Sequence, residues 1–484
     1  MQYPPLLSLS AALLLAGCVT VGPDYSPPVR ALPASFGETP AGVAPGAVEA
    51  AWWRGFDEPA LEALIQRALA ANHDVGIAAA RVEEARALLR ETRQDYLPRG
   101  GVAASYERRG RGEAERPAGE PSETESYRAA VDASWEVDLF GRVRRSAEAA
   151  AAEAGSREAL LRGVQAGVAA EVAATWFELA GIEAELTIVG EISSSQRESL
   201  RVIERLQASG AATEFDRLRA EALLHNVEVS APELQRRRTA AINALAVLVG
   251  ETPQAFRPPR AAPSGGALAL KTIAIGVPAE LLARRSDVTA AERRLAAATA
   301  RIGVATADLY PQVQVQGSIG LLSGSLEALG GGGAESWLVS PIVRWALLDT
   351  GRVRAQIAAS ETRAKEALIA YDQTVLRALG ETDNAFNAYG ASGEALQLRL
   401  QEAAANREAA RLARLRFSGG EGAYLDVLDA ERSDFASRRS LAVARTNHRL
   451  AVVGIHKALG GGWEICAESD HDCSGADGIG GSAM

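Results

Sequence analysis

The sequence predicts a mixed α/β membrane protein, built from a tandem internal duplication, with strands across the bilayer and long helices beyond it. Three observations lead to this fold class. Four segments alternate apolar and polar side chains, two proline-free stretches of about 65 residues follow a helical period, and characteristic motifs recur at a constant offset. The chain has 484 residues, which is enough for an elongated architecture of this kind.

The N-terminus carries an apolar stretch centred on residues 6–15 that ends in LLLAGC, with Cys18 as its last residue. The stretch is too short for a permanent transmembrane helix, so residues 1–17 are interpreted as a signal peptide. Small residues directly before Cys18 resemble a bacterial lipobox, in which the cysteine is lipidated and becomes the first residue of the mature chain. The alternative is an ordinary signal peptide with an incidental cysteine. Val19 follows, whereas an aspartate there would resemble an inner-membrane retention signal.

The chain repeats itself after 210 residues. WEVDLFGRVR (135–144) matches WALLDTGRVR (345–354), and DRLRAE (216–221) matches DVLDAE (426–431) at the same offset. Two separate matches at one offset predict a tandem duplication. The expected organisation is an N-terminal segment 18–71, a first repeat 72–257, a linker 258–283, a second repeat 284–463 and a polar tail 464–484.

Each repeat is expected to open with a helix and continue into a β-hairpin, at 98–139 in the first copy and 311–348 in the second. The alternation of side chains is clearest from residue 127 to residue 139, where every second residue is apolar. Such a sheet can also pack on helices in a soluble core. The other face is polar without being rich in Lys and Glu, however, and the strands have the length that crosses a membrane.

Four strands cannot close a membrane barrel, because about eight are the minimum. Oligomerisation is therefore expected, with strand edges paired between chains. Past residue 18 no apolar run reaches 18 residues, so a membrane crossing there must use strands.

After each hairpin the period becomes helical, and long helical pairs are expected at 142–249 and 352–459. Each first helix of about 65 residues would extend roughly 100 Å. It meets a turn of small residues, ASGAATE (208–214) or SGGEGAY (418–424), and the chain then returns as a shorter helix. A generic coiled-coil rod would account for the helices but not for the strands.

These features together resemble the TolC-like outer-membrane factors of tripartite efflux pumps, in the lipoprotein branch that works with RND-type exporters. The segments that carry the resemblance span nearly the whole mature chain: LAGC (15–18), VGPDY (21–25), SWEVDLFGRVRR (134–145), GVPAELLARRSDVTAAE (276–292), DTGRVRAQIAAS (349–360), YLDVLDAERSDF (424–435) and KALGGGW (457–463).

The resemblance implies a homotrimer in which four strands per chain form a 12-stranded transmembrane β-barrel that continues into a long periplasmic α-helical barrel. A short equatorial helix would lie in the N-terminal segment. The implied function is a passive exit duct in the bacterial outer membrane for drugs or other small molecules. The implied partners are a periplasmic adaptor, an inner-membrane RND-type transporter and outer-membrane lipid.

The resemblance also assigns site residues. In the family, an aspartate pair in a DVLDA segment narrows the periplasmic end of the pore, and here the pair corresponds to Asp426 and Asp429. Read from the residues alone, these are solvated surface acids. Some relatives place an arginine just before this segment, where Gly422 stands here, so a latch that needs that arginine is in doubt. The expected adaptor-docking tips are Ala208, Ser209, Gly210, Ser418, Gly419, Gly420 and Gly422, although glycine also simply ends helices.

Other functions find little support in the residues. A net charge of −10 disfavours nucleic acid, and no GxxxxGK, HExxH or GxSxG motif is present, so we expect neither an enzyme nor a metal or cofactor other than the lipid on Cys18. A periplasmic adaptor lipoprotein and a porin-like uptake channel remain as alternatives. The GRVR arginines (Arg142, Arg144, Arg352, Arg354) are expected to pair or to reach the membrane edge. The tail residues Cys466 and Cys473 are expected to form a disulfide.

Overall fold

The computed structural model describes residues 19–259, 273–278, 281 and 284–461, apart from residues 31, 34, 38, 47–48, 116–117 and 120. The expected signal peptide, Cys18 and the tail with Cys466 and Cys473 lie outside the described residues. The chain divides into two compact units. The first combines residues up to 29 with 80–158 and 290–373, and the second combines 30–79, 159–289 and 374–484. Each unit therefore takes segments from both repeats.

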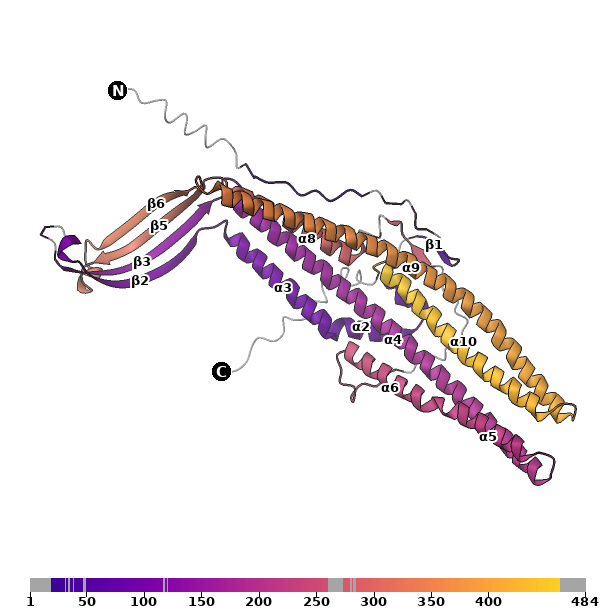
Figure 1. The fold of residues 1–484 in the computed structure, drawn as a ribbon. Helices are drawn as coiled ribbons and strands as arrows, with labels where there is room; N and C mark the ends of the chain where they lie inside the picture. Colours follow the sequence, from indigo (N-terminus) through magenta and orange to yellow (C-terminus); the bar gives the residue numbers. More distant parts are fainter. Residues whose placement is uncertain are drawn as a thin grey trace. The chain divides into compact units, whose positions relative to one another are not determined.

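The first unit contains a four-stranded antiparallel sheet (Figure 1). Its strands are β2 (Arg99–Gly110), β3 (Glu123–Val137), β5 (Gln312–Ser323) and β6 (Glu335–Arg344), in the order β2-β3-β5-β6. The expected hairpin of each repeat is present, and β3 pairs with β5 to join the two hairpins. β2 and β6 form the edges of the sheet.

The register of the sheet separates an apolar face from a polar one. Val102 pairs with Val131, Val131 with Ile319, and Ile319 with Trp337, so these four side chains form one row across all strands. They are 50–84% exposed. A soluble sheet would bury such a row, so the exposure disfavours packing of this face in a soluble core.

Two tryptophans link the sheet by hydrogen bonds to the segments that connect each hairpin to its preceding helix. Trp135 Nε1 donates to the carbonyl oxygen of Tyr96 at 3.1 Å, and Trp345 Nε1 donates to that of Leu309 at 3.0 Å. Both carbonyls lie two residues before the proline that precedes the strand. The same contact thus recurs in both repeats.

The change from strand to helix occurs at Gly141, whose φ of 80° favours glycine. Asp138 caps the first turn of the next helix, which starts at Arg142: its carboxylate accepts from the amides of Val143 and Arg144 at 3.0 and 2.9 Å. Thr20 packs so closely on Gly141 that a Cβ there would lie 2.7 Å from its methyl carbon.

Residues 21–25 pack against helices of the same unit. A Cβ on Gly22 would lie 2.4 Å from the Cα of Gly303, so the two backbones cross in contact. Arg145, whose side chain is 5% exposed, donates to the carbonyl of Val21 at 3.2 Å and forms an ion pair with Asp24 at 2.6 Å. The VGPDY segment is therefore a packed part of the fold.

The helices of the two repeats correspond up to the tips, and α2 precedes the first repeat. Their bounds are α2 (Pro59–Ala71), α3 (His73–Gln94), α4 (Arg142–Ala208), α5 (Glu214–Glu228), α6 (Ser230–Leu248), α8 (Ser286–Ala307), α9 (Thr350–Ser418) and α10 (Tyr424–Ala458). No helix among the described residues is both long and apolar enough to cross a membrane.

The two repeats differ in the returning helix. In the second repeat α10 is continuous, whereas in the first the chain returns as α5 and α6, with a break at Val229. The single shorter helix expected there is therefore wrong. Pro232 accounts for the break, because proline has no amide hydrogen and its ring clashes with the carbonyl four residues earlier.

The second unit holds the main hydrophobic core, which forms where α4 packs on α2, α6 and α10. Trp52 and Trp53 of the short helix η1 (Trp52–Phe56) are each 2% exposed, and Trp176 of α4 is fully buried. A two-stranded parallel sheet of β1 (Val43–Pro45) and β4 (Ile273–Ile275) lies in this unit as well.

His456 gives the second unit a pH-dependent stability. It is buried and stacks on Trp52 with ring centroids 5.0 Å apart, and burial lowers its pKa to about 4. In the unfolded chain this histidine binds a proton near pH 6.5, so its contribution to the free energy of unfolding should be fully present above pH 6.5. It should fall by about 3 kcal/mol as the pH drops to 4. Unfolding of the His456→Phe variant, which keeps the ring stack, should lose this part of the pH dependence. An unchanged pH profile would contradict the assignment.

Candidate functional site

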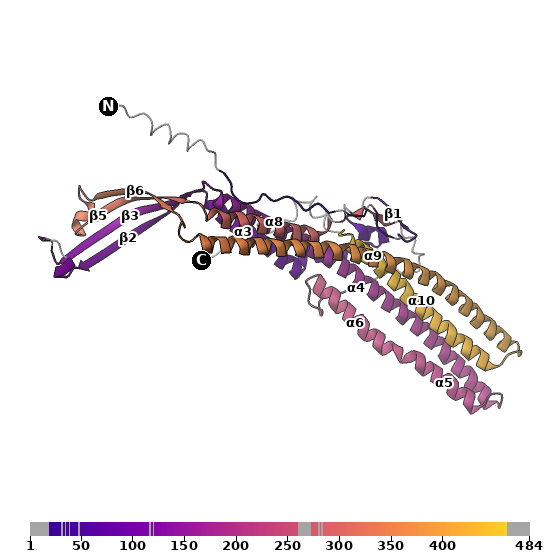
Figure 2. The ribbon, with the colours of Figure 1, turned by 45° about the horizontal axis from the view of Figure 1, so that its top comes forward.

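The turns that join α4 to α5 and α9 to α10 have the same geometry. Gly210 and Gly420, which lie 210 positions apart, have φ values of 76° and 78°. In each turn the amide of the residue after the glycine donates to the carbonyl five positions earlier. These hydrogen bonds run from Ala211 to Leu206 at 2.8 Å and from Glu421 to Arg416 at 3.0 Å. This is the Schellman arrangement that ends helices at glycine. The two tips lie at the same end of the second unit (Figure 1, Figure 2).

The residues expected to dock an adaptor all lie in these two tips. Ala208 and Ser418 are the last residues of α4 and α9, and the turns follow them. All are exposed except Gly422, which is half-buried against Arg416. The hydroxyls of Ser209 and Ser418 each donate to a carbonyl three residues earlier. The tips also expose apolar side chains, such as Phe215 and Leu425, which a partner can contact together with the backbone of the turns.

The returning helices begin differently. Thr213 caps α5 in a capping box with Asp216, and the threonine hydroxyl holds the pKa of Asp216 below its usual value. Ala423 stands at the same position before α10 and makes no side-chain cap. Asp426 is the counterpart of Asp216. Within the described chain its carboxylate has no hydrogen-bond or ion-pair partner, so it is available to solvent or to a cation.

Asp429 lies three residues further on the same exposed helix face. Its carboxylate is 66% exposed and pairs with Arg432 at 3.0 Å. The opposite face of this helix end is apolar and buried, at Val427 and Leu428. One protomer therefore presents two exposed carboxylates at the tip of its second hairpin.

A buried glutamate that sequence reasoning missed connects the two hairpins. Glu431 is 3% exposed, accepts from Gln196 Nε2 at 2.6 Å and from Arg414 Nε at 2.7 Å, and so joins α10 to α4 and α9. A signal for it existed, since glutamate ends both DRLRAE and DVLDAE three residues after a leucine.

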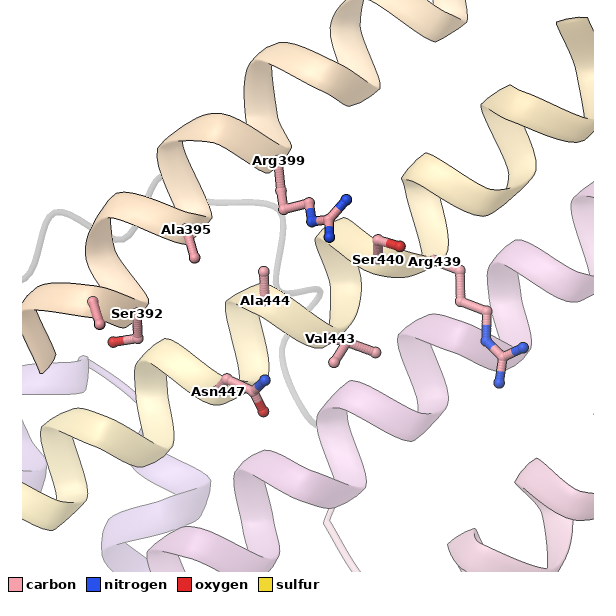
Figure 3. Close-up of a pocket in the computed structure, with 9 residues that line it drawn as sticks. Ser392, Ala395, Arg399, Arg439, Ser440, Val443, Ala444 and Asn447 are labelled. Atoms are coloured by element: carbon pink, nitrogen blue, oxygen red, sulfur yellow. The ribbon is translucent and has the colours of Figure 1, made fainter. Parts of the chain in front are cut away.

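A second buried carboxylate, Glu185 of α4, accepts from Arg439 of α10 at 2.9 Å. Next to it, a groove of about 640 Å³ runs between α9 and α10 (Figure 3). Its small side chains include Ser392 and Ala444, and Arg399 lies at its edge. Arg399 pairs with Glu402 at 2.6 Å, so both arginines of the groove already have carboxylate partners.

Two of the four GRVR arginines pair with carboxylates, Arg142 with Glu136 and Arg352 with Asp349. The pairing expected for them is confirmed at these two positions. Among the described residues, no cluster of three or more His, Cys, Asp or Glu side chains is placed to hold a metal ion.

Comparison with known proteins gives consistent matches over nearly all of the chain. The model of the outer membrane efflux protein family matches residues 64–251 and 277–461, one segment in each repeat. Outer membrane protein OprJ of Pseudomonas aeruginosa is 32% identical over 465 residues, which cover 95% of this chain and 97% of that protein. Solvent efflux pump outer membrane protein SrpC of Pseudomonas putida is 30% identical over 471 residues, with coverage of 95% and 98%. The solved outer-membrane channel OprN superposes with a TM-score of 0.84 at 36% identity, with coverage of 92% and 99%.

Proposed function

The chain belongs to the outer membrane efflux protein family, and from this premise we propose that it forms a trimeric duct whose opening is controlled at the periplasmic helix tips. It is the outer-membrane channel of a tripartite efflux system and extends into the periplasm. As a duct it catalyses no reaction. SrpC is part of a solvent efflux pump. For this chain we propose drugs or other small molecules as cargo.

The open sheet supports the trimer. Its edge strands, β2 and β6, have no partner strand among the described residues. Three copies that pair β2 with the neighbour's β6 would close twelve strands into a barrel without free edges. The exposed apolar row at Val131 would then face lipid, and the polar face with Asp132 and Gln316 would line the duct.

The tip aspartates support a gate. Asp426 and Asp429 are exposed on one helix face, and a trimer would bring six carboxylates to the pore axis. Like charges at that density repel one another, so a closed tip needs cations, protons or donors between them. A cation bound there would narrow the pore at its periplasmic end. The adaptor would dock on the same exposed turns, at Gly210 and Gly420.

The packing of residues 20–25 supports lipidation of Cys18. The amide of Val21 donates to the carbonyl of Phe140 at 3.1 Å, directly beside Gly141, where the sheet ends and α4 begins. A lipid two residues before Thr20 would therefore start at the level where the sheet leaves the membrane. We expect mass spectrometry of the mature N-terminus to find Cys18 as an acylated first residue. An unmodified chain that begins elsewhere would refute this.

The duct itself can be tested on the purified protein. Mass photometry in detergent should give the mass of a trimer, because one four-stranded sheet cannot close a barrel and the proposed duct takes its twelve strands from three copies. Reconstituted in planar bilayers, the trimer should conduct ions, and a divalent or trivalent cation added on the periplasmic side should reduce that conductance. A monodisperse monomer, or block only from the opposite side, would contradict the proposed architecture or the position of the gate.

A further inference from the structure

The first unit contains a cavity that the duct and its gate do not explain. Its volume is about 380 Å³, and it lies between α3, α4 and α8. Twelve residues line it, drawn from residues 81–92, 146–157 and 301–304 of these three helices. The volume is at the low end of the range for small-molecule pockets, so it suits one small ligand.

The charges around this cavity do not balance. Arg157 and Arg301 share a single carboxylate, that of Glu153, at 3.4 and 3.7 Å. Arg81 forms no ion pair with any residue that the structure describes, although Glu84 also lines the cavity. Three guanidinium groups thus meet two carboxylates. An anion would restore the balance, and the planar guanidinium fork fits carboxylate, sulfate and phosphate oxygens.

The remaining lining is apolar. Leu88 is 53% exposed on α3, and Ala85, Ala149, Ala150 and Val304 continue the surface from the three helices. A half-exposed leucine beside unbalanced arginines offers two kinds of contact within one cavity. A ligand that uses both must carry an anionic head and an apolar chain.

We propose that this cavity binds the anionic head of a single-chain amphiphile between Arg81, Arg157 and Arg301, with the chain against Leu88. The limited volume selects one chain over the two chains of a phospholipid. The binding site is distinct from the tip aspartates and does not depend on the proposed gate. The same head chemistry also occurs on membrane lipids, so the source of the amphiphile is decided by experiment.

The test uses the trimer in nanodiscs of zwitterionic lipid, with decanoate titrated by isothermal calorimetry. Decanoate should bind saturably, whereas decanol, which lacks the charge, and acetate, which lacks the chain, should not bind over the same range. Arg81→Gln and Arg301→Gln should each weaken decanoate binding roughly tenfold, and Leu88→Asn should weaken it as well. Arg90→Gln is the matched control, because Arg90 is exposed on the same helix but outside the cavity.

Equal binding of decanol, no binding of decanoate, or identical affinity in the two arginine variants and the control would overturn the proposal. Trimer mass and circular dichroism of each variant show whether it has folded. Nanodiscs that contain phosphatidylglycerol separate the two sources of ligand. Unchanged decanoate binding there supports a single-chain amphiphile as the ligand, whereas displacement by this two-chain lipid would contradict the selection of one chain by the cavity.

Discussion

Arg414→Leu is expected to destabilise the packing between the two hairpins by about 3 kcal/mol, the lower end of the range for a broken buried ion pair. The guanidinium of Arg414 is 48% exposed, but its partner Glu431 is 3% exposed. Without Arg414 the carboxylate stays buried with only the amide of Gln196 as a donor. Thermal unfolding and hydrogen exchange of α10 in the purified protein measure the loss.

Arg399→Leu is the matched control for this prediction. Arg399 is on the same helix, is also 48% exposed, and pairs with Glu402, which is itself 42% exposed. An exposed pair of this kind contributes about 0–1 kcal/mol, so the control should be nearly silent. The double variant Arg414→Leu, Glu431→Met removes the buried charge and should recover much of the stability. Equal effects of Arg414→Leu and Arg399→Leu would show that the buried carboxylate of Glu431 does not depend on Arg414 for charge compensation.

The strands were predictable because their chemistry is local. Alternation through Val131 and Trp135 is visible in neighbouring residues, and the exposed apolar row that it implies is present in the structure. The duplication was equally predictable, because the motifs recur at an offset of 210 residues. The structure reflects it in the tip turns, where the φ values of Gly210 and Gly420 agree within 2°. The comparisons with known channels confirm the family that these patterns indicated.

The partners of buried charges were not predictable in this way. Gln196 and Glu431 are 235 residues apart in the chain, and no sequence pattern around either residue predicts that they are in contact. The break at Val229 is a different case, because Pro232 was visible and its effect on the preceding turn follows from its ring. The free carboxylate of Asp426 also has a sequence signal, since Ala423 replaces the capping Thr213 of the first copy.

Replacing both Asp426 and Asp429 with alanine should strongly weaken the cation block at the periplasmic end of the channel. The parent trimer would present six carboxylates there, and multivalent cations bind such a ring far more tightly than monovalent ions do. We expect the concentration for half-block to rise at least tenfold, which corresponds to about 1.4 kcal/mol of lost binding free energy. Single-channel conductance with and without a trivalent cation on the periplasmic side measures it.

Trimer assembly should be unaffected, because both aspartates are exposed and neither belongs to a strand or to the buried core. Glu421→Ala is the control within the same tip: it removes an exposed carboxylate from the turn but leaves the aspartate pair on its helix face. If general acidity of the tip bound the cation, this control would weaken the block as the double variant does. If only the ring matters, the control stays blocked like the parent. A double variant that is still blocked as strongly as the parent would show that these two aspartates do not form the constriction.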